Sequence, residues 1–122
     1  MQNQNFKVEP MPLDKRTSQF ARNVRHFVKK LPRTISNIED AKQLVRSSGS
    51  IGANYIEANE AISKKDQIYR MKICRKETKE TVFWLNNIEI SINESYRDEW
   101  SVLINEAKEL FLIFCAIVRK SS

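Results

Sequence analysis

Few side chains in this sequence could support catalysis or bind a metal. A carboxylate-bridged metal site in a helical bundle needs Glu from two helices and a Glu-x-x-His motif from two others. Glu77 and Glu80 form a Glu-x-x-Glu pair and Glu57 precedes them, but no Glu-x-x-His occurs, and the only histidine, His26, lies in a basic segment. The sequence therefore predicts no metal site.

Motifs for nucleophilic catalysis and phosphate cradling are also missing. The chain has no G-x-S-x-G motif, and Cys74 and Cys115 stand in apolar periodic segments without metal-ligand spacing. We expect both cysteines to be buried free thiols in a reducing compartment, with a disulfide or ligand role as the alternative. Gly49 and Gly52 lack the G-K-[S/T] ending of a phosphate loop. We expect a non-enzymatic protein without a cofactor.

Basic side chains gather in two segments of the chain. Residues 1–33 carry a net charge of +6 and residues 64–80 carry +4, whereas residues 34–63 and 81–122 each carry −2. Such segregation is typical of a surface that faces an anion, and phosphate contacts of this kind give salt-sensitive binding with little sequence discrimination. A solvated helix face would show a similar pattern, and no RNA-reading module with exposed aromatic residues is visible. The candidate phosphate contacts are Arg22, Arg25, Lys29, Arg33, Lys65, Lys72, Lys76 and Lys79.

Polar residues of the stretch 43–58 form a second candidate cluster. Arg46 and Glu57 share one side of a helix but lie about 16 Å apart along its axis, so they cannot pair with each other. The partner of Arg46 must come from another helix or from a neighbouring subunit. We expect a buried polar network that fixes the assembly geometry, with a solvated face as the alternative. The expected members are Arg46, Asn54, Glu57, Glu77 and Glu80, with Glu77 or Glu80 as the partner of Arg46.

Helices must position these residues. Only two Gly and three Pro among 122 residues, with 30% charged residues, favour one domain of long helices. Pro10 and Pro12 predict a flexible arm over residues 1–13, ahead of a bundle domain over residues 14–122. The apolar periodicity predicts helices from Asp14 or Thr17 to Leu31, from a Ser36–Glu39 capping box to about Glu60, from Lys65 to Ile90, and from after Asp98 to Arg119.

The stretch 43–58, QLVRSSGSIGANYIEA, holds both glycines of the chain yet keeps helical spacing. A glycine inside a helix costs about 1 kcal/mol relative to alanine, so a close contact must compensate. We expect Ser48 and Gly52 to form a close-packing seam toward the bundle, which Gly52→Leu would disrupt by overpacking.

Apolar residues on the third and fourth helices exceed the needs of one core. A strip of Tyr69, Ile73 and Trp84 lies well round the third helix from its inner seam, and the fourth helix is apolar on all sides between Leu110 and Val118. The surplus predicts packing against copies of the chain through heterologous contacts, with Tyr69, Ile73 and Trp84 as the candidate oligomer face. The expected inner seam is Met71, Cys74, Thr78, Thr81, Leu85 and Ile88, and the fourth helix is expected to bury Leu103, Ala107, Leu110, Phe111, Phe114, Ile117 and Val118.

Four amphipathic helices with short links predict an all-α, antiparallel up-down-up-down four-helix bundle. The chain shows no apolar N-terminal region of the secretory type, and its longest apolar run, Leu110 to Val118, is far shorter than the ~20 residues that span a bilayer. We expect a cytoplasmic protein without membrane contact.

The run QLVRSSGSIGANYIEA, followed by SKKDQIYRMKICRKETKETVFWL, resembles the bacterial 23S rRNA intervening-sequence proteins, which are related to the accessory variability protein of diversity-generating retroelements. The similarity covers roughly residues 15–120. The family commonly has proline in place of Gly52 and often glycine in place of Ala58. The resemblance implies a barrel-like homopentamer with a basic surface, association with nucleic acid and, for the retroelement branch, a reverse-transcriptase partner. It offers no catalytic residue.

The leading hypothesis is a non-enzymatic homopentamer of four-helix bundles that binds RNA or DNA through basic surfaces. One alternative is a protein–protein adaptor for the reverse transcriptase of a diversity-generating retroelement. Another is a purely structural oligomer.

Overall fold

The computed structural model of the protein describes residues 11–90 and 93–121. This part of the chain forms four helices and no strand, which confirms the all-α prediction. Of the expected arm, residues 1–10 lie outside the described ranges, and the first helix already begins at Leu13. The helices are α1 (Leu13–Val28), α2 (Ile35–Asn59), α3 (Lys64–Asn87) and α4 (Glu94–Ser121).

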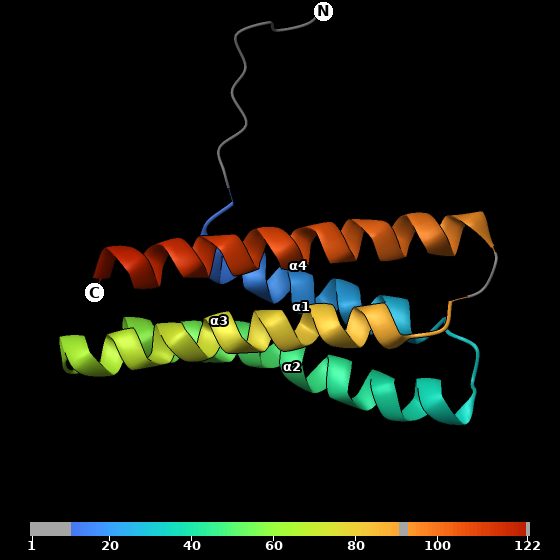
Figure 1. Ribbon diagram of the computed structural model, residues 1–122, viewed down its shortest axis with the longest axis horizontal. Coiled ribbons are helices and arrows are strands. Elements are labelled where there is room, and N and C mark those ends of the chain that lie inside the picture. The colour runs from blue at the N-terminus through green and yellow to red at the C-terminus, as the bar shows by residue number, and fades with distance from the viewer. Residues whose placement is uncertain (1–10, 91–92, 122) are drawn as a thin grey trace, which may run out of the picture.

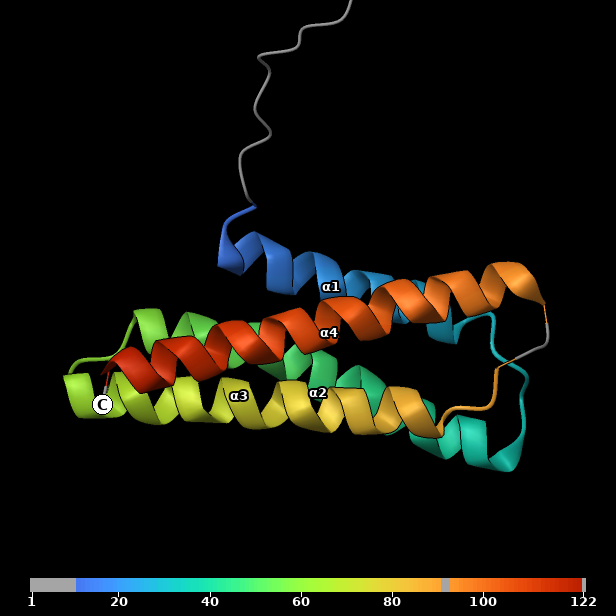
Figure 2. The ribbon, with the colours of Figure 1, turned by 45° about the horizontal axis from the view of Figure 1, so that its top comes forward.

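The four helices lie side by side along one long axis, and the connections between them alternate between its two ends (Figure 1). Helix α2 packs against α1 and α3, and α4 packs against α3 and α1. Within the described residues the backbones of α1 and α3 do not come close to each other, so the two helices stand diagonally across the bundle. With 16 residues against 28, α1 is much shorter than α4, whose C-terminal end extends past the start of α1 (Figure 2).

The core consists of apolar stripes that each helix turns inward. All six residues of the expected inner seam of α3, from Met71 to Ile88, are buried, because their three- and four-residue spacing keeps them on one side of the helix. Burying a large apolar side chain contributes about 1.5–3 kcal/mol relative to leaving it exposed. In α4 the expected residues are buried except Phe111 and Ile117, which are only partly buried.

Helix starts differ from the sequence prediction in three places. Helix α2 is capped by Thr34, whose hydroxyl accepts from the backbone N–H of Asn37 at 3.1 Å, and Ser36 already lies inside the helix. Helix α1 has no side-chain cap; it follows Pro12, a residue that fits a helix start because the first N–H groups are unpaired there. Helix α4 begins before Asp98 because the Asn93 side chain accepts from the backbone N–H of Ser95 at 2.9 Å.

The glycine-containing stretch is helical throughout, since α2 runs unbroken from Ile35 to Asn59. A Cβ placed on Gly52 would lie 2.9 Å from Thr17 Oγ1 and 3.3 Å from Thr17 Cβ, closer than ordinary van der Waals contact. Ser48 is buried on the same helix. The expected seam of small residues therefore exists, and the helix that packs on it is α1.

None of the helices in the described ranges is long and apolar enough to cross a membrane.

Candidate nucleic-acid interface

The eight candidate phosphate contacts are alike in their exposure and in their ion pairing. All are exposed, and within the part of the chain that the structure describes none of them forms an ion pair with a carboxylate. The basic residues that do form ion pairs are others: Arg16, Lys30, Lys42 and Arg46. The charge of the eight side chains is therefore free to attract an anion.

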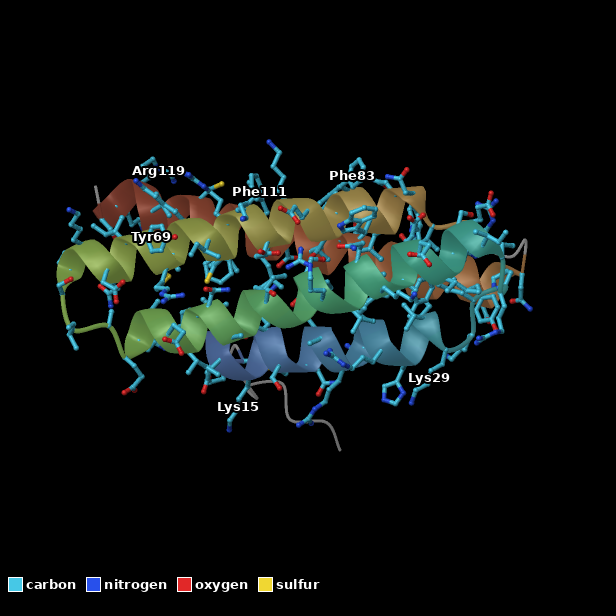
Figure 3. All side chains as sticks on the ribbon, turned by 90° about the horizontal axis from the view of Figure 1, so that it is seen from below. Lys15, Lys29, Tyr69, Phe83, Phe111 and Arg119 are labelled. Carbon is cyan, nitrogen blue, oxygen red and sulfur yellow. The ribbon has the colours of Figure 1, made fainter. Side chains whose placement is uncertain are left out.

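The structure divides these eight residues between two separate faces. One set lies on α1 and the loop after it, and the other lies on α3, diagonally across the bundle. Figure 3 shows the separation: Lys15 and Lys29 project from one side with α1, whereas Tyr69 and Phe83 of α3 lie toward the other side with Phe111 and Arg119 of α4. The sequence suggested that both segments could contact phosphates together, but within one chain they do not form a continuous surface.

The basic face of α3 is a single row of side chains. Steps of four, three, four, three and four residues lead from Lys65 to Phe83, which keeps every member on one side of the helix. Two of its members are aromatic: Tyr69 is 59% exposed and Phe83 is 55% exposed. We call this row the α3 stripe; it consists of Lys65, Tyr69, Lys72, Lys76, Lys79 and Phe83.

The predicted basic face does not include these two exposed rings, and the row is not one of the known RNA-reading modules. The sequence pattern predicts an apolar strip that includes Tyr69 and predicts no face for Phe83. The four-residue steps from Lys65 to Tyr69 and from Lys79 to Phe83 place both rings in the lysine row.

The face on α1 is less regular. Arg22, Lys29 and His26 are exposed. Arg25 leans onto α2: its guanidinium would lie 3.3 Å from a Cβ at Gly49, and it donates to the backbone oxygen of Ala21. Arg33 lies beyond the helix, at the rim of a groove of about 450 Å³ between α1 and α2.

The polar cluster is assembled only in part. Arg46 Nη2 lies 3.4 Å from Glu77 and 3.0 Å from Glu80, so α3 supplies its partners. The Glu77 side chain is 8% exposed, but that of Arg46 is 50% exposed, which places the contact at the rim of the bundle. Asn54 instead accepts from Arg70 at 3.3 Å, and Glu57 is exposed and outside the group. The five residues of the expected cluster therefore do not form a single buried network.

Two further polar groups hold the bundle together, and the sequence prediction missed both. Arg16 makes a bidentate contact with Glu106 at 2.6 and 2.8 Å and a third bond to Glu109 at 2.7 Å, and these bonds raise the pKa of its guanidinium. The buried Asn37 side chain donates to the backbone oxygens of Pro32 and Glu89 and accepts from the N–H of Glu89. Asn37 thus joins the α1–α2 and α3–α4 connections, and no local sequence pattern indicates such a long-range pairing.

The candidate oligomer face is not one open strip in the single chain. Tyr69 is exposed, Ile73 is partly buried, and Trp84 packs against the chain's own core. Trp84 also meets Phe83 edge-on, with ring centroids 4.9 Å apart. Most of the surface of Trp84 is therefore used within the bundle.

Reactive and metal-binding groups are sparse in the described residues. They contain no group of three His, Cys, Asp or Glu side chains that could hold a metal ion. Both cysteines are free thiols; Cys74 is buried as expected and Cys115 only partly. Burial raises the pKa of Cys74 to about 12, with a smaller contribution from Glu77, and its thiol donates to the backbone oxygen of Ile51. Cys74 is therefore protonated, and not nucleophilic, near neutral pH.

The fold and these faces together define a small all-helical bundle with exposed basic faces on α1 and α3. Residues 11–113 match the family model of the 23S rRNA-intervening sequence protein, and this chain belongs to that family. A crystal structure of a protein of unknown function from the S23 ribosomal protein family of Bacteroides thetaiotaomicron shares 28% sequence identity with it, with a TM-score of 0.71. That match covers 87% of this chain and 94% of the other. None of the curated proteins compared with the sequence matches it.

Proposed function

We propose that this chain is a non-enzymatic, cytoplasmic nucleic-acid-binding protein that works as a homopentamer of antiparallel four-helix bundles. The observation that carries the proposal is the state of the eight basic residues on α1 and α3. They are exposed and form no ion pairs in the described part of the chain, and four of them repeat along one side of α3. A row of basic side chains without carboxylate partners can contact successive phosphates of a polyanion.

Self-assembly would make weak phosphate contacts effective. The C-terminal half of α4 keeps apolar surface beyond what the bundle covers: Leu112 is 65% exposed and its neighbours Phe111 and Ile113 are only partly buried. Packing of this surface against another copy would repeat both basic faces around the assembly. A repeated face engages a long polyanion at several points, which raises avidity without any new contact.

A binding series with labelled RNA and DNA tests the proposal. We expect binding at 50 mM salt that weakens steeply toward 200 mM, because each phosphate contact releases counterions. Reversing the charge at Lys72, Lys76 and Lys79 together is expected to weaken binding at least about tenfold and to lower the salt slope by roughly three.

The matched control reverses three exposed basic residues outside the candidate set that form no ion pair in the described residues, namely Arg97, Lys108 and Lys120, and so changes net charge equally. Its effect should be clearly smaller. Equal effects of the two triple variants, or no binding at 50 mM salt, would refute the proposed interface. A chain that assembles normally but binds no polyanion would favour the adaptor function instead.

A further inference from the structure

We propose that the α3 stripe binds an unpaired, single-stranded nucleic acid, with bases stacked on Tyr69 and Phe83 and phosphates held by the lysines between them. The inference rests on the proposed nucleic-acid function and adds to it the kind of strand and the residues that select it.

The spacing of the stripe supports this assignment. Lys65 and Phe83 are 18 residues apart, which is five full helical turns, and the row between them measures about 27 Å. Lys72, Lys76 and Lys79 fill the interval between the two rings, and no acidic residue interrupts the row. The two rings lie 14 residues apart, about 21 Å along the helix, so they could stack two separate bases of one strand while the lysines between them contact the intervening phosphates.

Phe83 is held in place while it stays accessible, and Tyr69 lies beside a guanidinium. Phe83 stands edge-on to Trp84, at an interplanar angle of 80°, and Trp84 is itself packed against the core. The Arg70 guanidinium lies 6.0 Å from the centroid of the Tyr69 ring, and the residue is still 59% exposed. A braced ring loses little conformational freedom when a base stacks on it.

Ring stacking distinguishes strand types because only an unpaired base offers a free face. In a duplex the base faces are covered by their neighbours, and a lysine row alone would bind duplex and single strand through phosphate without such a preference. The stripe has no aromatic cage and no group placed to read a base edge, so we expect tolerance of sequence and of sugar type.

Fluorescence anisotropy with oligonucleotides of about 12 nucleotides tests the inference, since single-strand sites span roughly 4–16 nucleotides. The probes are oligouridine, oligothymidine and a duplex of equal length. We expect both single strands to bind more tightly than the duplex. Tyr69→Leu and Phe83→Leu should each weaken single-strand binding about tenfold, or about 1.4 kcal/mol, and leave duplex binding unchanged.

Leucine keeps helix propensity and apolar character, so these variants should fold, which circular dichroism and a denaturation curve check. Val102→Ala is the matched control, because Val102 is 66% exposed on the side of α4 that faces α1 and its loss should not affect binding. The inference fails if the aromatic variants bind single strands normally, if duplex binds as well as single strand, or if only one sugar type binds. It also fails if the variants change the particle mass in light scattering, since the rings would then be subunit contacts. Loss on lysine reversal without loss on ring removal would leave the nucleic-acid function standing and remove only the stacking.

Discussion

A missing side chain at Gly52 sets how closely α1 approaches α2. Because a Cβ there would fall 2.9 Å from the buried Thr17 hydroxyl, a larger residue must push the two helices apart or displace Thr17. Gly52→Leu is therefore expected to lower the free energy of unfolding by about 1–3 kcal/mol, measured by chemical denaturation.

The other glycine of α2 provides the control for this substitution. A Cβ at Gly49 would meet only the Arg25 guanidinium, at 3.3 Å, and that flexible end can move. Gly49→Ala should leave stability unchanged or raise it by up to about 1 kcal/mol, through helix propensity. Equal stability of Gly52→Leu and the wild-type chain would show that the seam is not tight.

The buried thiol of Cys74 predicts a loss of stability in alkali. Its pKa is about 12 in the folded chain against an ordinary value of 9.0, so above pH 9 the unfolded state releases this proton while the folded state keeps it. The stability that the protonated Cys74 thiol contributes to the folded chain is fully present below pH 9 and declines as the pH rises from 9 toward 12. Because lysines and tyrosines also titrate in this range, the measurement is the difference in unfolding free energy between wild type and Cys74→Ala at pH 8 and pH 10.5. The wild type should lose more stability than the variant; parallel losses would contradict the assignment.

Residue-level prediction from sequence succeeded where periodicity decides and failed where long-range partners decide. The inner seam of α3 and the small seam of α2 follow from helical phase, which the sequence contains. The Arg16 contacts with Glu106 and Glu109 join residues some ninety positions apart, and the Asn37 bridge joins two connections. Neither could be derived from local spacing.

At the scale of the helices, the start of α2 shows how a capping pattern can mislead. Ser36 and Glu39 have the spacing of a capping box, but the chain is already helical at Ile35 and the extended residue before it is Thr34. A cap requires non-helical backbone as well as a side-chain oxygen, and only the fold determines which of two nearby hydroxyl residues has it.

This assignment predicts unequal effects of two similar substitutions. Thr34→Ala removes the acceptor of the Asn37 N–H and should lower the free energy of unfolding by about 1 kcal/mol. Ser36→Ala removes a hydroxyl inside the helix that makes only long contacts, of 3.4 Å, to Thr34 and Glu89, so it should change stability little. Thermal or urea unfolding of both variants measures the difference. A larger loss of unfolding free energy for Ser36→Ala than for Thr34→Ala would support the capping box instead.

At the scale of the whole molecule, the sequence predicted the number and order of the helices but not which basic and apolar surfaces would be continuous. An up-down-up-down bundle places the first and third helices diagonally, so the two basic segments predicted as phosphate contacts lie on separate faces of one chain. Apolar surplus shows the same limit. The apolar pattern predicts that Trp84 faces another subunit, yet Trp84 is partly buried against its own core, whereas Leu112 is exposed.

The openness of Leu112 gives a test of the proposed assembly. Leu112 lies in the apolar stretch of α4, beside partly buried Phe111 and Ile113, whereas the equally exposed Val102 on the same helix stands beside Ser101 and close to Asn105. A glutamate at position 112 costs the single chain little, because exposed substitutions usually change stability by less than about 0.5 kcal/mol. In an oligomer that buries this position, the same glutamate would be an unpaired buried charge.

We therefore expect the wild type to scatter light as a particle five times the 14.3 kDa chain mass, Leu112→Glu to shift toward the single chain, and Val102→Glu to leave the particle intact. A wild type that is monomeric at all concentrations would refute assembly altogether, and an intact Leu112→Glu particle would move the subunit contact away from the C-terminal half of α4.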